Sequence, residues 1–480
     1  MSQAQSIESR GGRAEPLTIS YRCALLNAIT TVAFGLLENG AEIYRVEDST
    51  QRMFAAYGRP DADIFAIPGS IIITIYDEDG RPWTKTRRVL RRANDFDKLA
   101  RLNALCRYIC QEKPDCGEIL RRYEEINRRP VYRFSIRLLA VALVSAGFAL
   151  MFKASLGDAF AAGLIGLAAL LLIQFMDYFK TNNVFTTIAA SGLIMGLALF
   201  AVRIGLAHNA DLVAISVLMN LVPGSLLTYA IRDIIAGDLL SGVTRLAEAF
   251  LVAAAIAVGA GVALYFLSGF FGSEILLPVL VEAGGAGTAG GAGAVAAGGA
   301  GAAVGAVAAG LNQPGGFLQS LPASLPSLWE LALSVLYAFI ACFGFSLTYN
   351  VRSKMLFFAP LGAGLSWLVY RCTGFLGGDL VQYFLGAVAL SIYAEAMARV
   401  EKVPVTVVML ISLLPLVPGG GIYYTMEHCI RGDADLFLST GIHTLAIAGT
   451  LALGILLVST IVRLWSQVAA LRRQQKTQKT

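Results

Sequence analysis

The sequence predicts an α-helical polytopic membrane protein with ten transmembrane helices in a 5+5 inverted repeat and a small N-terminal α+β domain in the cytoplasm. Three observations predict this fold. The chain of 480 residues is 56% hydrophobic and 15% charged, whereas soluble proteins carry about a quarter of charged residues. Ten apolar runs follow residue 130, and a motif of the first five recurs in the last five.

The N-terminal region is mixed in composition. Residues 1–16 are polar and are expected to form a disordered tail, and residues 17–130 are expected to form the α+β domain. Changes in hydrophobic period predict its elements. They are two helices within 17–57, a β-meander within 61–90, and helices at about 95–111 and 115–129.

Several functions are disfavoured by the residues present. Cys106, Cys110 and Cys116 lack a second thiolate pair or a nearby His, so buried reduced thiols are expected and no metal site is. The domain has no phosphate-binding loop and no nucleophile motif, so we expect no cofactor, no enzyme activity and no catalytic residue. The net charge of +5 comes mainly from loops beside apolar runs, which is not a nucleic-acid footprint.

Ten apolar runs beyond Pro130 have roughly the length that a helix needs to cross a bilayer. They fall into a first repeat at 131–268 and a second at 328–464, separated by a Gly/Ala-rich linker at 269–327 and followed by a basic tail at 465–480. The runs lie near 134–152, 157–176, 184–206, 211–231, 245–267, 328–350, 354–371, 379–398, 404–424 and 437–462.

Loop charges predict the orientation. With the N-terminal domain inside, most Arg and Lys residues between the runs lie in cytoplasmic loops, as the positive-inside rule requires. The first apolar run begins only near residue 135, so no cleavable signal peptide is expected. We expect both termini in the cytoplasm and the chain in a lipid bilayer.

An internal repeat is the sharpest signal in the sequence. The segment Leu221-Val222-Pro223-Gly224-Ser225 recurs as Leu416-Val417-Pro418-Gly419-Gly420, an offset of 195 residues. The same offset aligns Tyr229 with Tyr424, Gly237-Asp238 with Gly432-Asp433, and Glu248 with His443. Five crossings separate the copies, and five is odd, so the halves should be inverted. Inverted repeats are characteristic of secondary transporters.

The two Pro-Gly pairs lie within the fourth and ninth runs, where proline removes a backbone donor and should break each helix. In a transporter such breaks expose amides and helix dipole ends to the substrate. A purely structural kink is the alternative. The expected substrate-binding residues are Asn220, Pro223, Gly224, Ser225, Thr228, Tyr229, Pro418, Gly419 and Gly420.

Ionisable residues at membrane depth are costly and are therefore candidates for proton coupling. A histidine side chain can accept or release a proton in a transport cycle, which makes His443 a candidate, with a hydrogen-bonded core histidine as the alternative. A local ion pair is the alternative explanation for Glu248, with Arg245, and for Glu395, with Arg399. Solvation at a helix end is the alternative for Asp233 and Asp238. The candidates are Asp177, Asp233, Asp238, Glu248, Glu395 and His443.

The chain also resembles a known family. The motifs are 38–48 (Glu38-Asn39-Gly40-Ala41-Glu42 to Asp48), Tyr57-Gly58, Ile67-Pro68-Gly69-Ser70, 84–88, and 222–238 with Ala230-Ile231-Arg232-Asp233. They look like the bacterial threonine/serine exporter family, and the second half with Leu416–Gly420 resembles the partner module that some bacteria encode separately. The resemblance implies export of L-threonine and L-serine driven by the proton motive force, across the inner membrane of a bacterial cell. The two-protein relatives are associated with succinate-type dicarboxylates, which leaves the substrate open.

We therefore expect a proton-coupled exporter of threonine and serine, whose partners are the substrate, protons and the lipid bilayer. An exporter of dicarboxylates and a channel remain alternatives. A homo-oligomer is compatible with the sequence, and nucleic acid is not an expected partner.

Overall fold

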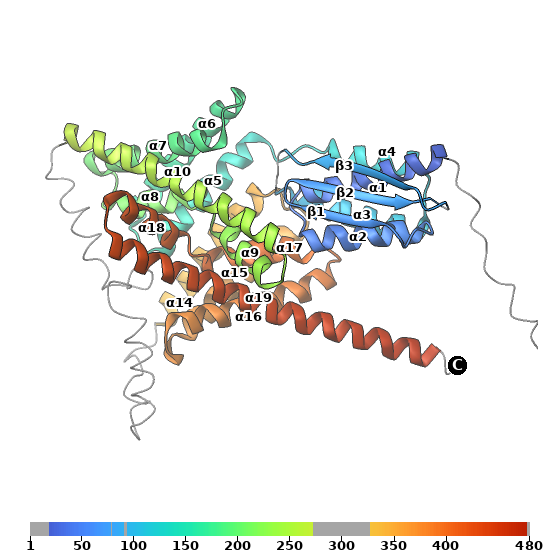
Figure 1. The fold of residues 1–480 in the computed structure, drawn as a ribbon. Helices are drawn as coiled ribbons and strands as arrows, with labels where there is room; N and C mark the ends of the chain where they lie inside the picture. Colours follow the sequence, from blue (N-terminus) through green and yellow to red (C-terminus); the bar gives the residue numbers. More distant parts are fainter. Residues whose placement is uncertain (1–18, 78, 91–93, 272–326, 478–480) are drawn as a thin grey trace, which may run out of the picture. The chain divides into compact units, whose positions relative to one another are not determined.

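The computed structural model describes residues 19–77, 79–90, 94–271 and 327–477. Internal contacts divide the chain into two compact units, Met1–Pro130 and Val131–Thr480, which we call the N-terminal unit and the membrane unit (Figure 1). The expected tail at 1–16 and nearly all of the expected linker at 269–327 lie outside the described residues.

The N-terminal unit combines helices with one antiparallel sheet of strand order β1-β2-β3, the meander that the sequence predicts. Strand β2 supplies the fully buried Ile71 and Ile73, whereas Phe65 and Ile72 lie exposed on the sheet. This alternation matches a strand with one face on a core. The elements are α1 (Ile19–Glu38), α2 (Ile43–Ala56), β1 (Asp63–Ile67), β2 (Ser70–Tyr76), β3 (Pro82–Arg88), α3 (Phe96–Glu112) and α4 (Cys116–Asn127).

The membrane unit is helical throughout its described part. Its first half comprises α5 (Phe134–Met151), α6 (Leu156–Tyr178), α7 (Asn183–Arg203), α8 (Ala210–Leu218), α9 (Gly224–Ile235) and α10 (Leu239–Phe271). Its second half comprises α14 (Leu328–Thr348), α15 (Met355–Cys372), η2 (Gly374–Leu376), α16 (Asp379–Val400), α17 (Val405–Leu413), η3 (Leu414–Leu416), α18 (Gly419–Arg431) and α19 (Ala434–Thr477). Helix α19 thus continues through most of the segment expected as a basic tail.

Eight of the described helices are long and apolar enough to cross a membrane, and a ninth span results if Val405–Leu416 and Gly419–Cys429 are taken as one bent segment. Helices α8 and α9 have 9 and 12 residues, and each alone is shorter than a bilayer crossing. The protein is therefore a multi-pass membrane protein, and the predicted number of ten crossings depends on whether α8 and α9 form one broken span.

Helix packing within the first half has a counterpart in the second. Helix α5 packs on α6 and α7 on α10, as α14 packs on α15 and α16 on α19. Between the halves, α9 packs on α19 and α18 on α10. The first helix of each half, α5 and α14, pack on one another, and Gly147 lies against Ala341 while Gly344 lies against Ala140. Because the residue numbers run in opposite directions along the contact, α5 and α14 are antiparallel.

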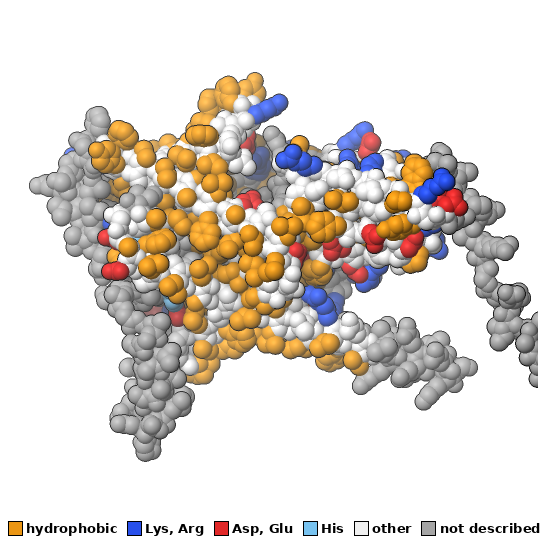
Figure 2. Space-filling model, in the orientation of Figure 1, with side chains coloured by type: hydrophobic (Ala, Val, Ile, Leu, Met, Phe, Trp, Pro, Cys, Tyr) orange, Lys and Arg blue, Asp and Glu red, His pale blue; other side chains and the backbone are white. Residues whose placement is uncertain are grey.

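The surface of the membrane unit suits a lipid environment. Hydrophobic side chains spread over its visible face (Figure 2), whereas the buried positions between helices are rich in alanine. Large exposed aromatic residues occur near helix ends, among them Tyr178 on α6, Tyr265 on α10 and Trp329 on α14. Aromatic residues favour the boundary between lipid and water, so these rings fit the edges of a membrane-embedded band.

Candidate functional site

Both Pro-Gly segments interrupt their helices, as the sequence predicts. In the first half α8 ends at Leu218 and α9 begins at Gly224, directly after Pro223. In the second half α17 passes into the 3-10 turn η3, and α18 begins at Gly419 after a bend of 55°. Proline cannot donate a backbone hydrogen bond, which accounts for the interruption at each site.

The two breaks contact each other. A Cβ atom on Gly224 would overlap the Val417 side chain, so the first break lies directly against the second. Conversely, a Cβ on Gly419 would come within 3.3 Å of Val222 Cγ1. Residues 224 and 222 are equivalent to 419 and 417, so each glycine contacts the other half's valine. Such reciprocity is expected about a two-fold axis.

Helices α9 and α18 both start at this contact. Their first residues follow Pro223 and Pro418, whose rings offer no acceptor to cap the first amides. The positive ends of both helix dipoles therefore lie at the meeting point of the breaks. The amide of Gly419 donates to the Val417 carbonyl at 2.7 Å in this structure. Two helix N-termini that begin with glycine nevertheless form an arrangement suited to a carboxylate.

The other predicted substrate residues lie around the first break. Asn220 Nδ2 donates to Ser145 Oγ at 3.1 Å and to the Val217 carbonyl at 3.0 Å, which ties the break to α5. Thr228 is fully buried and its hydroxyl donates to the Gly224 carbonyl at 3.3 Å. Ser225 is half-buried in the first turn of α9. Tyr229, which follows Thr228, is also buried, and its ring centroid lies 4.6 Å from the Arg232 guanidinium carbon.

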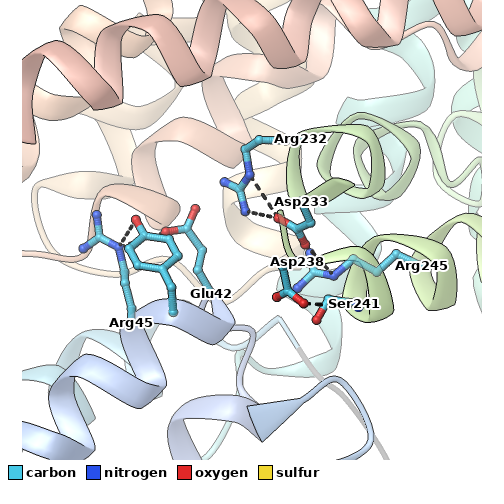
Figure 3. A network of polar contacts seen from close by, with 8 residues as sticks. Glu42, Arg45, Arg232, Asp233, Asp238, Ser241 and Arg245 are labelled. Carbon is cyan, nitrogen blue, oxygen red and sulfur yellow. Dashed lines mark hydrogen bonds and ion pairs between the residues drawn. The ribbon is translucent and has the colours of Figure 1, made fainter. Parts of the chain in front are cut away.

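A buried ionic cluster follows at the far end of α9 (Figure 3). Asp233 receives Arg232 Nη2 at 2.9 Å, and Arg245 Nε of α10 lies 3.4 Å from its other oxygen. Asp233 is only 8% exposed, so the solvated helix end considered from sequence is wrong for this residue. Asp238 instead lies at the start of α10, where its carboxylate accepts from the Ser241 amide at 3.4 Å.

His443 on α19 has a partner that sequence reasoning missed. Its Nε2 lies 2.9 Å from Asp379 Oδ2, the first residue of α16. The available signal was the position of Asp379, a carboxylate placed at the start of an apolar run behind Gly377-Gly378. The histidine is thus in an inter-helical pair and is not an isolated core residue.

The remaining proton-coupling candidates lie on different helices of the membrane unit. Asp177 is exposed in the last turn of α6, Glu248 is exposed on α10, and Glu395 is half-buried on α16. The six candidates therefore occupy several separate helices.

Asp158 is a second buried carboxylate that the sequence did not single out. It accepts hydrogen bonds from Ser155 and, at 2.6 and 3.2 Å, from the amides of His208 and Asn209. These contacts join the start of α6 to the segment leading into α8. Because its oxygens accept hydrogen bonds from amides and a hydroxyl, Asp158 has a structural role. It belongs to the capping box of α6 and also holds the segment before α8.

The N-terminal unit has its own buried carboxylate, Asp97, which pairs with Arg101 and Arg129. Among the described residues no group of three His, Cys, Asp or Glu side chains could hold a metal ion. Cys106 is 5% exposed, and burial raises the pKa of its thiol to about 12. A thiol of this kind is inert at neutral pH.

Comparison with known families gives two matches that together extend over most of the chain. A family model described as a threonine/serine exporter matches residues 27–267. A second model, also described as a threonine/serine exporter, matches residues 334–461. Neither the curated proteins nor the solved structures provided a match.

Proposed function

The chain belongs to the threonine/serine exporter family, with both modules fused in one polypeptide, and from this premise we propose that it is a proton-coupled secondary transporter that exports threonine and serine. Membership of a transporter family implies a non-enzymatic role. The proposal extends to ten crossings, in which α8–α9 and α17–α18 are the broken fourth and ninth spans.

The proposed architecture is an inverted repeat. The antiparallel contact of α5 with α14 supports it, because equivalent helices of inverted halves must point in opposite directions. The matched helix pairs and the reciprocal glycine–valine contacts support it as well. Two inverted copies can exchange conformations to open toward one side of the membrane and then the other.

The substrate is proposed to bind where the two breaks meet, and this contact is the observation that carries the proposal. The amino ends of α9 and α18 would attract the substrate carboxylate. Asn220, Ser225 and the hydroxyls of Thr228 and Tyr229 are the candidates for reading its side chain. Separation of Gly224 from Val417 would open the site.

In the proposed orientation both termini are cytoplasmic. The Arg232–Asp233–Arg245 cluster then lies toward the cytoplasmic end of the first half, and the start of α16 lies toward the outside. Positive loop residues support this orientation. Proton coupling is assigned to one or more of the six candidates, of which His443 has the most suitable chemistry.

Reconstituted protein tests the function directly. Liposomes with an acidic lumen should accumulate labelled threonine and serine as protons leave, and an uncoupler should abolish the accumulation. Accumulation of succinate in their place would favour the dicarboxylate alternative. Flux that never exceeds the equilibrium distribution would indicate a channel and contradict the proposal.

A further inference from the structure

The Asp379–His443 pair connects two helices that both reach the second break. Asp379 begins α16, and Gly386, about two turns further, is so close to Leu416 of η3 that a Cβ would lie 2.8 Å from Leu416 Cδ1. On α19, Thr444 directly follows His443, and its hydroxyl would overlap a Cβ placed on Gly421 of α18. The pair therefore links α16 and α19, the two helices that contact the segments on either side of the Pro418-Gly419 break.

The pair is partly exposed, and a cluster of aromatic rings lies one helical turn from Asp379. The side chains of His443 and Asp379 are 24% and 41% exposed. One turn further along α16, the Tyr383 ring lies 4.8 Å from that of Tyr370 on α15, which stacks on Trp367. Asp379 is thus the more exposed member of the pair, and an aromatic cluster follows one turn further along α16.

Other charged and titratable groups surround this end of the second half. Helix α15 contributes Tyr370 and Arg371, and α16 contributes Tyr383 beside Asp379. Helix α18, which packs on α19, carries the Glu427–Arg431 ion pair and His428 in its last turns. In contrast to these groups, His443 lies within ion-pair distance of Asp379.

The first half lacks the same chemistry. Position 443 is equivalent to 248, where an exposed glutamate stands. An imidazole that can change charge between pH 5 and 8 thus occurs at this position in the second half alone. At this position the second half therefore has a histidine where the first half has a glutamate.

We propose that Asp379 and His443 together form the proton-binding site of the transport cycle, accessible from the outer side in the proposed orientation. This inference rests on the proposed function. The Nε2–H group of neutral His443 donates to the Asp379 carboxylate, and a proton from water binds Nδ1. The net charge of the pair changes from −1 to 0, and release of the same proton restores it. A neutral pair is less costly to enclose than a charged one, so proton binding favours closure of α16 and α19 on the break.

The test separates coupling from substrate binding. Wild type, His443→Gln and Asp379→Asn are reconstituted as full chains and assayed for threonine counterflow without a pH gradient and for accumulation into liposomes with an acidic lumen. Both variants should keep counterflow within about twofold and lose gradient-driven accumulation by about tenfold, the size of a typical coupling free energy. Asp379→Glu keeps the carboxylate and should recover part of the driven transport.

Glu330→Gln is the matched control, because Glu330 is an exposed carboxylate in the first turn of α14. It should behave as wild type in both assays. Full driven accumulation by His443→Gln overturns the inference, and so does equal loss of counterflow and accumulation, which would assign the pair to substrate binding or folding. Absence of any threonine, serine or succinate transport by the wild type would instead overturn the proposed function and the inference with it.

Discussion

The two broken segments of the membrane unit share their backbone design but differ in the ionisable side chains beyond each break. Each has a short helix, a Pro-Gly interruption and a second helix of 12 or 13 residues. The first break leads to the buried Arg232–Asp233–Arg245 cluster, whereas α18 ends in the Glu427–Arg431 pair within one helix. The fold has retained its repeat, while the charged groups have diverged.

Equivalent positions make the divergence specific. Arg232 corresponds to Glu427, Asp233 to His428 and Glu248 to His443. Two inverted halves with identical side chains would give two end states of equal energy. Different charges at equivalent positions make the energies of the two states unequal. They also make the two states respond differently to protons, which is what a coupled exporter requires.

The shared feature, the contact between the breaks, should give the largest mutational effect on the transport rate. Gly224→Val and Gly419→Val each place a branched side chain where a single Cβ already meets the opposite break. Overpacking of this kind costs about 1–3 kcal/mol, so we expect transport to fall by about tenfold or more in both variants. Initial rates of threonine counterflow in liposomes measure it.

Gly449 on α19 provides the control, because a Cβ there meets nothing within 4 Å. Gly449→Ala should transport as wild type does. Normal counterflow by Gly224→Val, at normal membrane insertion, would mean that the contact of the two breaks has no part in the cycle.

The charged groups that differ between the halves should affect stability much more in the first half than in the second. Asp233→Ala leaves two buried arginines without their shared carboxylate, and removing one partner of a buried ion pair typically costs about 3–5 kcal/mol. At the equivalent position, His428 Nδ1 is buried with no hydrogen-bond partner among the described residues, so His428→Ala should cost little. Thermal unfolding of the purified variants in detergent compares them. Equal shifts in Tm would contradict the claimed asymmetry.

Much of the secondary structure could be predicted from the sequence because it depends on the residues within each segment. Hydrophobic period gave the helices and the meander of the N-terminal unit, and proline chemistry gave the two helix breaks. The count of crossings is harder, since α8 has 9 residues and its break extends over 219–223. A span divided in this way satisfies the length criterion only as a whole.

Site partners were less predictable, because they depend on which helix faces meet. Sequence spacing suggested Glu248 for Arg245, whereas the proximity of Arg245 to Asp233, twelve residues earlier on another helix, could not be seen from spacing. Likewise Asp379 is 64 residues from His443 and comes next to it only through the packing of α16 on α19. The reciprocal contact of the breaks required both halves in three dimensions.

The smallest expected effect concerns a bond that one break has and the other cannot form. Asn220 donates to Ser145 on α5, whereas the equivalent position in the second half is Pro415, which has no side-chain donor. A typical hydrogen bond contributes about 0.5–1.5 kcal/mol, so Asn220→Ala should weaken apparent threonine affinity by about two- to tenfold. Combining it with Ser145→Ala in a double-mutant cycle isolates the pair, because the two effects should then be less than additive. If the two effects on affinity were fully additive, Asn220 would act on the substrate or on another group and not through α5. The asymmetry between the breaks would then lie in binding and not in packing.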